Sequence, residues 1–301
     1  MKRLSAVGCQ LSALMVACVA HAQTATTGVP AERFSPAVGP TALVGVEGAA
    51  VTPAGALSWA ASVDAVGDPI NLRTAFTDMR LSEPVDYALV ADLALELGVW
   101  KRLALAVGVP VVLYQQGDRL QGTGTSERAL ATTVAGDVRI RAKASLVEGK
   151  RLGAAVLLQV TAPARGQSDF AATDGATVEP RLVVDAHLGR LTLAASVGAR
   201  FQKERTLFTT QFGDELTWAA AAAAAIVQRP MGGLVAIVEA AGGVGPSAGT
   251  RPAEIRGALR VPLGAVALDV GGGAGLDGDV GAAAWRVFLV ARSGWSPSVL
   301  R

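Results

Sequence analysis

The clearest signal in the sequence is an alternation of apolar and polar side chains with a period of two. Between Val134 and Leu146 the even-numbered positions carry only apolar or small residues, whereas the odd-numbered ones include the charged residues Asp137, Arg139, Arg141 and Lys143. Successive side chains of a strand point to opposite faces, so a strand separates these two sets. A helix would spread the charges around its circumference. The segment therefore predicts a strand with one apolar and one charged face.

The same alternation recurs along the chain and predicts about twelve strands. Their expected spans are 55–64, 86–97, 103–114, 134–146, 152–163, 177–188, 191–203, 214–227, 233–244, 254–262, 265–273 and 282–292. Short links are expected at 98–102, 147–151, 189–190, 228–232 and 263–264, and they alternate with long ones at 65–85, 115–133, 164–176, 204–213, 245–253 and 274–281. This alternation predicts antiparallel neighbours with tight turns at one end of the sheet and longer loops at the other.

One segment has two competing interpretations. Seven consecutive alanines occupy positions 219–225, and alanine is the best helix former. However, Leu216, Trp218 and Ile226 share one parity, and the polar Glu215 and Thr217 share the other. We therefore favour a strand here as well.

Composition places these strands in a membrane. Hydrophobic residues make up 51% of the chain, charged residues 17%, and the mean hydropathy is +0.40, but outside the N-terminus no apolar run reaches the length of a transmembrane helix. A closed barrel is the other structure that satisfies all backbone polar groups in lipid. The sequence predicts an all-β fold: one transmembrane antiparallel up-and-down barrel of about twelve strands over 55–292, in the bacterial outer membrane, with a tail at 293–301.

The N-terminus has the features of an export signal. Lys2 and Arg3 precede an apolar stretch at 11–20, and Ala20-His21-Ala22 offers small residues for cleavage before Gln23. A lipoprotein signal ending at Cys18 is the alternative. We expect residues 1–22 to be a signal peptide and 23–54 a loosely ordered periplasmic lead.

The signal removes chemistry from the mature chain. Cys9 and Cys18 both lie inside it, so no disulfide or thiolate metal site is expected after cleavage before Gln23. His187 is then the one remaining histidine, and no metal or other cofactor is expected. The net charge of +2 indicates no nucleic-acid partner. The expected partners are outer-membrane lipid and small solutes.

The charged faces of the strands are expected to line the barrel lumen. Its positive candidates are Arg139, Arg141, Lys143, Arg181, Arg200, Arg256, Arg260 and Arg286, and its negative candidates are Asp92, Glu96, Asp137, Glu179, Asp185, Glu215, Glu239 and Asp269. Such a lining could select solutes on a path through the barrel, with the Arg139, Arg141 and Lys143 cluster favouring anions. Alternatively, the charges pair across strands and fill a structural barrel whose loops bind partners.

A third hypothesis is a membrane-embedded lipid hydrolase, which would need a nucleophile beside a base. His187 would be the base, Ser196 the nucleophile and Asp185 the orienting group. No activated-nucleophile motif surrounds the serine, so we expect the protein not to be an enzyme.

Several short segments resemble a known barrel family. They are Ala31 to Pro40, Leu105 to Gln115, Gly136-Asp137-Val138-Arg139 and Val178-Glu179-Pro180-Arg181-Leu182. Together they resemble the N-terminal barrel of OmpA-family proteins from deltaproteobacteria such as myxobacteria. More distantly, the pattern is similar to outer-membrane proteins of aromatic-degradation pathways or hydrophobic-solute transport. This resemblance implies a barrel. A peptidoglycan-binding domain, which often follows the barrel in that family, is not implied for this chain.

Overall fold

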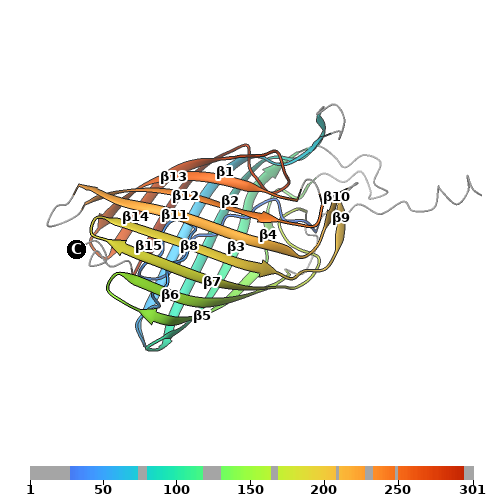
Figure 1. The fold of residues 1–301 in the computed structure, drawn as a ribbon. Helices are drawn as coiled ribbons and strands as arrows, with labels where there is room; N and C mark the ends of the chain where they lie inside the picture. The colour runs from blue at the N-terminus through green and yellow to red at the C-terminus, as the bar shows by residue number, and fades with distance from the viewer. Residues whose placement is uncertain are drawn as a thin grey trace, which may run out of the picture.

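The chain folds into a closed antiparallel β-barrel (Figure 1). The computed structural model describes residues 28–73, 80–117, 130–163, 169–207, 210–227, 233–247 and 250–294. The expected signal peptide, Cys9, Cys18, Gln23 and the tail beyond Gly294 lie outside these ranges. Within them, no helix has the length and hydropathy needed to cross a bilayer.

Twelve long strands build the barrel wall, and their alternating side chains decide which face is buried. They are β1 (Leu57–Arg73), β2 (Arg80–Trp100), β3 (Leu103–Gln116), β5 (Val138–Glu148), β6 (Leu152–Ala162), β7 (Thr177–Leu188), β8 (Leu191–Arg200), β11 (Glu215–Val227), β12 (Leu234–Val244), β13 (Ala253–Leu263), β14 (Val266–Gly275) and β15 (Trp285–Ser293). Three short strands accompany them: β4 (Val134–Ala135), β9 (Arg205–Leu207) and β10 (Thr210–Phe212).

The sheet closes on itself with neighbours in sequence lying side by side. Its order runs β2-β1-β15-β14-β13-β12-β11-β8-β7-β6-β5-β3, and pairing of β2 with β3 completes the ring. All wall pairs are antiparallel. The expected all-β, up-and-down barrel of twelve strands is thus confirmed, and closure leaves no sheet edge exposed to lipid.

The strand bounds differ most from expectation in the first hairpin. Residues 65–85 were expected to form a long link, but β1 continues to Arg73 and β2 begins at Arg80. The alternation of apolar and polar residues is weak in this part of the sequence. The backbone pairing of β1 with β2 nevertheless continues, with register shifts after Gly67. The expected link at 204–213 contains the β9–β10 hairpin, and the link at 228–232 lies outside the described residues.

The alanine run is part of strand β11, so the strand interpretation is confirmed. Ala219 to Ala224 pair with β8 on one side and Ala219 to Ala225 with β12 on the other, and the Ala225 N–H donates to the Arg190 carbonyl at 3.0 Å. Leu216, Trp218 and Ile226 face outward, whereas Glu215 is buried inside. Two neighbouring strands satisfy every backbone group of the run, and this outweighs the local helix preference of alanine.

The expected strand at 134–146 is interrupted by a bulge. β4 pairs with Val111 and Val112 of β3, and β5 resumes the pairing with Arg139 opposite Gly108. Pro110, on the facing strand, has no N–H to donate, but its carbonyl accepts the Gly136 N–H at 2.9 Å. The extra residue on the β4–β5 side therefore marks a β-bulge.

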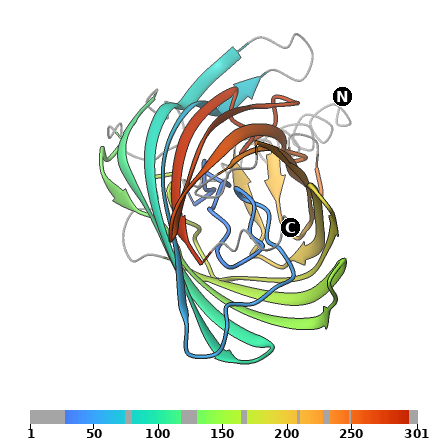
Figure 2. The same cartoon turned by 90° about the vertical axis from the view of Figure 1, so that its left-hand side faces the viewer.

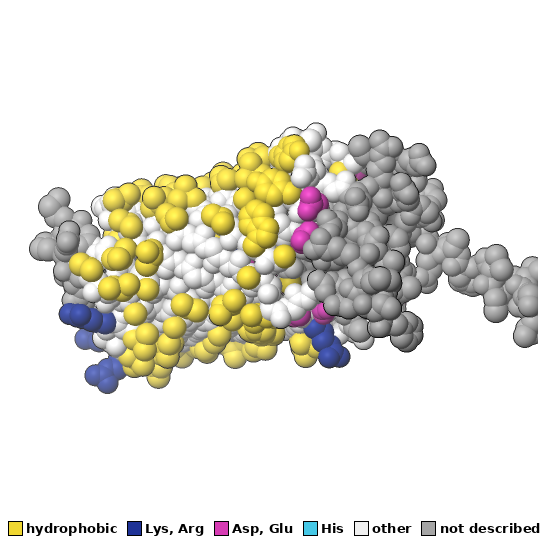
Figure 3. Space-filling model, turned by 90° about the horizontal axis from the view of Figure 1, so that it is seen from above, with side chains coloured by type: hydrophobic (Ala, Val, Ile, Leu, Met, Phe, Trp, Pro, Cys, Tyr) yellow, Lys and Arg dark blue, Asp and Glu magenta, His cyan; other side chains and the backbone are white. Residues whose placement is uncertain are grey.

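The outer surface of the wall is apolar (Figure 3). Outward-facing side chains such as Ile140, Val238 and Val287 are each more than half exposed. Exposed Lys and Arg side chains lie instead at the ends of the barrel. At the short-turn end they are Lys101, Arg102, Lys150, Arg151 and Arg190. An apolar belt ending in a charged rim matches the profile of a bilayer.

Residues 28–54 run through the inside of the barrel, and we call them the lumen segment (Figure 2). Most of their side chains are buried, including Phe34, Val44, Val46 and Glu47. The expectation of a loosely ordered lead is therefore wrong for these residues. Lumen charges that the alternation predicts need partners, and this segment supplies them.

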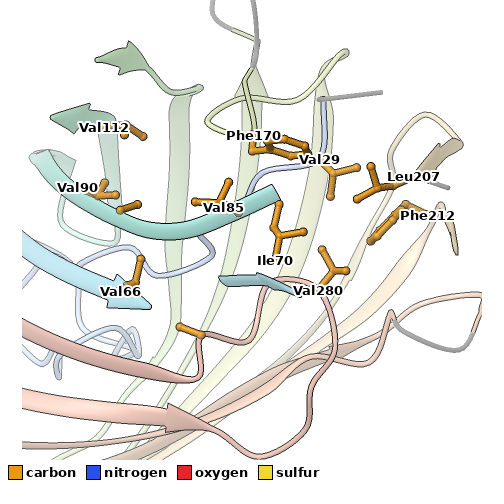
Figure 4. Close-up of a cluster of buried hydrophobic side chains, with 13 residues drawn as sticks. Val29, Val66, Ile70, Val85, Val90, Val112, Phe170, Leu207, Phe212 and Val280 are labelled. Carbon is orange, nitrogen blue, oxygen red and sulfur yellow. The ribbon is translucent and has the colours of Figure 1, made fainter. Parts of the chain in front are cut away.

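The lumen segment begins in an apolar cluster at the long-loop end (Figure 4). Val29 packs there with residues of the first hairpin and of the loops, among them Ile70, Phe170, Phe212 and Val280. Its other end reaches the short-turn end, where the Gly55 N–H donates to the Gly98 carbonyl at 2.8 Å. The segment thus traverses the barrel from one end to the other.

The apolar outer face predicts that a charged substitution there destabilises the barrel, and that the loss of stability is larger in the middle of a strand than at its end. Val238 lies in the middle of β12 and Leu263 at the turn end of β13, and both face outward. We expect Val238→Arg to reduce the free energy of unfolding in lipid by about 2–4 kcal/mol, and Leu263→Arg by about 0–1 kcal/mol. Urea titration of the folded band on unheated gels measures both. Equal costs for the two variants would contradict the membrane placement.

Candidate functional site in the lumen

The inside of the barrel holds all the charged residues that the alternation assigned to it. Asp92, Glu96, Asp137, Glu179, Asp185, Arg141, Lys143, Arg256 and Arg260 are buried, and Arg139, Arg181 and Arg200 are partly buried. Their inward position is thus observed. Their role in selecting solutes stays a prediction.

The basic cluster on β5 is paired with carboxylates from two directions. Arg139 forms an ion pair with Asp92 of β2. Arg141 and Lys143 bind Glu47 of the lumen segment at 2.6 and 3.1 Å. Lys143 also lies 3.4 Å from Glu96 of β2. The cluster is therefore a cross-link between the wall and the lumen segment, where burial makes each partner necessary.

A second ion-pair group begins on β7, which β6 separates from β5. Glu179 of β7 accepts from Arg181 at 2.7 Å and from Arg200 at 3.0 Å. Arg200 continues to Glu215 of β11 at 3.4 Å, and Glu215 binds Arg33 of the lumen segment at 2.5 Å. The chain of charges joins three wall strands to the segment.

Two arginines hold the turn of the lumen segment by its carbonyl groups. Arg260 and Arg292 both bind Asp269, at 2.6 and 3.0 Å. Arg260 also donates to the Ala42 carbonyl at 3.0 Å, and Arg292 to the Ala37 carbonyl at 2.9 Å. Gly39 lies within this turn at a φ of +116°, a conformation that glycine adopts without strain.

The lumen segment also presents successive backbone N–H groups to a wall carboxylate. Val44, Gly45 and Val46 donate to Glu239 of β12 at 2.6, 2.9 and 3.3 Å. Consecutive N–H groups of this kind form an anion-binding concavity. Arg256 lies 3.5 Å from the same carboxylate. Glu239 is thus the centre of the contact between the segment and the wall.

An aromatic side chain anchors the segment near its start. The Phe34 ring stacks on Phe288 of β15 at 5.6 Å between centroids. The guanidinium groups of Arg256 and Arg286 lie 5.0 and 5.2 Å from the centre of the Phe34 ring, which favours cation–π attraction. Arg286 in turn binds Asp64 at 2.6 Å.

The remaining predicted residues also contact loops or the segment. Asp185 accepts the Ala49 N–H at 2.7 Å. Asp137, at the bulge, accepts the Thr173 N–H at 2.9 Å. Arg286 has two further partners, Glu32 at 2.9 Å and Glu254 at 2.6 Å. The predicted charges therefore form several separate groups spread along the lumen.

The register of β7 and β8 separates the proposed base of a hydrolase from its proposed nucleophile. His187 lies opposite Thr192, whereas Ser196 lies opposite Val183. Four residues of strand separate the two levels by roughly 13 Å, too far for proton transfer between the serine and the histidine. His187 instead contacts Asp185 at 3.5 Å and the Thr192 hydroxyl at 3.3 Å. Among the described residues, no group of three or more acidic, histidine or cysteine side chains could hold a metal ion.

A cavity of about 210 Å³ remains between the lumen segment and the wall. It is bordered by lumen-facing residues of β5 to β8 and β11 to β13, by residues 29–35 of the segment and by loop residues near Thr173. Its charged lining consists of Arg33, Arg139, Arg141, Arg181, Arg200, Arg205, Arg256, Glu32, Glu47, Asp137, Glu179 and Glu254. A small polar molecule could occupy this cavity.

Sequence reasoning missed the residues that lie outside clear alternation. Glu32, Arg33 and Glu47 come from a segment without strand periodicity, and Arg205 comes from a loop hairpin. Burial lowers the pKa of the Arg205 guanidinium, and the nearby carboxylates of Asp174 and Asp137 partly offset this effect. A usable signal was present: the strand charges required partners, and the preceding segment carried carboxylates.

Removing the charge of Glu239 should loosen the lumen segment. We expect Glu239→Gln to weaken the three N–H contacts, reducing the free energy of unfolding by about 1.5–3 kcal/mol. Amide exchange of Val44, Gly45 and Val46 should quicken about ten- to hundredfold. Glu148→Gln, at an exposed strand end, is the control. Unchanged exchange in Glu239→Gln would contradict the described contact.

Comparison with known proteins supports the fold. No family model matches the chain, and no curated protein matches it. An outer membrane channel from Pseudomonas putida F1 aligns with a TM-score of 0.56 and 14% identity, covering 81% of this chain and 97% of that one. The NanC porin aligns at 0.49 with 6% identity, over 80% and 100% of the two chains. LpxR from Salmonella typhimurium aligns at 0.42 with 11% identity, over 78% and 99%. The chain therefore shares the barrel fold of the first of these structures.

Proposed function

We propose that the protein is an outer-membrane barrel that passes or binds small solutes in a lumen narrowed by residues 28–54. The apolar outer surface supports the membrane location, and the similar barrel from P. putida is described as an outer membrane channel. The observation that carries the proposal is the charged cavity of about 210 Å³ left beside the lumen segment. A cavity of this size admits small molecules but is too small to be an open porin pore.

Export by a cleaved signal and membership of the OmpA family remain part of the proposal. The signal residues lie outside the described ranges, and the resemblance to OmpA-family barrels rests on short segments alone. A passive role requires no catalytic group, which agrees with the separation of His187 from Ser196.

A specific observation favours the alternative, a structural barrel with a filled lumen. The lumen segment is tied to the wall by ion pairs at Glu47 and Arg33 and by the contacts of Glu239. In this alternative the segment stays in place and the loops bind partners. The two functions differ in whether ions cross the barrel.

Conductance of the purified protein in planar bilayers separates these functions. We expect small channels from the unchanged protein and larger ones from the Glu239→Gln variant, because a loosened segment leaves more of the lumen open. Arg139→Gln combined with Arg141→Gln should lower the preference for chloride over potassium. Arg102→Gln, at an exposed turn, controls for purification and insertion.

The absence of channels from both the unchanged protein and Glu239→Gln would refute solute passage and favour the structural role. If the double arginine variant kept the ion preference of the unchanged protein, the β5 cluster would have no part in selectivity.

A further inference from the structure

Arginines outnumber carboxylates in the lining of the lumen cavity. Seven arginines and five carboxylates line it, which leaves two positive charges in excess. Each of the five carboxylates already accepts a hydrogen bond: Glu32 and Glu254 from Arg286, Glu47 from Arg141, Asp137 from the Thr173 N–H and Glu179 from Arg181.

By contrast, several arginine nitrogens of the cavity lining donate no hydrogen bond to the residues that the structure describes. Six nitrogens on four of these arginines are buried without a hydrogen-bond partner in the described part of the chain: Nε of Arg139 and Arg256, and both Nε and Nη2 of Arg141 and Arg205. Apart from the Ser35 hydroxyl, these nitrogens are the only buried side-chain atoms of the described cavity lining that lack a partner. Buried N–H groups that have no acceptor are costly, so the cavity fits a ligand that supplies acceptors only.

Two of these arginines lie beside the same glycine of β3. Gly108 of β3 faces the lumen opposite Arg139. A Cβ placed on Gly108 would lie 3.4 Å from Arg139 Nε and 3.7 Å from Arg141 Nη2. Both nitrogens lack a partner, whereas the other ends of the two side chains are held by Asp92 and Glu47. The paired ends fix the guanidinium groups and leave their free N–H groups beside the same glycine.

We propose that a small oxyanion, a carboxylate or a phosphate, binds between Arg139 and Arg141, two arginines of the cavity lining that lie beside Gly108. The inference rests on the proposed function, because it names the class of solute that the lumen holds. An oxyanion accepts several charge-assisted hydrogen bonds at once.

Binding is measured by titration calorimetry on the full purified chain in detergent and low-chloride buffer. Sodium phosphate and sodium acetate are the two probes, with glycerol as an uncharged comparison. We expect saturable binding of at least one anion, and the tighter of the two identifies the ligand class. Saturable glycerol binding of equal strength, or no anion binding, would overturn the proposal.

The decisive variant is Gly108→Ala, because it keeps every charge. Its methyl group would lie in ordinary contact with Arg139 Nε and Arg141 Nη2 and would cover these donors, so we expect anion binding to weaken about tenfold or more. Gly257→Ala on β13 is the matched control, since a Cβ there meets nothing closer than the Ile237 carbonyl at 4.0 Å. Unchanged affinity in Gly108→Ala would place the anion elsewhere and refute the site.

A second variant guards against local misfolding of the first. Arg139→Gln removes the Nε donor and should also weaken binding about tenfold, whereas Arg102→Gln should not. The same preparations are tested for conductance. Anion binding without channels would refute solute passage but keep this site, and channels without anion binding would refute this site but keep solute passage.

Discussion

The structure depends on one constraint: every polar group of a chain that crosses lipid has to find its partner inside the protein. The closed ring from β2 to β3 satisfies the backbone. The period-two alternation turns apolar side chains toward lipid and sends charged ones inward. Inside the barrel, however, the charges need partners of their own, because a buried unpaired charge is costly. The lumen segment is where many of these partners are found.

This constraint explains why the interior is both filled and charged. Glu47 links Arg141 and Lys143, Arg33 reaches Glu215, and Glu239 receives three backbone N–H groups. The wall and the segment therefore stabilise each other. Between the wall and the segment remains a cavity. Each carboxylate of its lining accepts a hydrogen bond, whereas several of its arginine nitrogens have no partner in the described part of the chain. The proposed solute site lies in this cavity, and the same ion pairs that fill the lumen shape it.

The wall was predictable from sequence because one local rule decides it. Arg139, Arg141 and Lys143 point inward as their parity required, and Leu216, Trp218 and Ile226 mark the alanine run as a strand. The interior could not be predicted in the same way. Residues 28–54 have no periodicity, and their position follows from contacts with strands up to 255 residues away, such as Ala37 with Arg292. The bulge at Gly136 likewise depends on Pro110 across the sheet.

A cysteine cross-link between the lumen segment and the wall tests the central claim most directly. A Cβ on Gly153 of β6 would lie 2.9 Å from the Ala49 Cβ and would also meet the Asp185 carboxylate, so the spacing of a disulfide requires a shift of about 1 Å and a rotation of the Asp185 side chain. The pair Ala49→Cys and Gly153→Cys should form a disulfide on oxidation of the folded protein in lipid. The pair Ala49→Cys and Ala154→Cys should not, because alternation turns residue 154 to the outside. A disulfide in the first pair alone is the predicted result, and its absence in the folded barrel would contradict a lumen occupied by residues 28–54.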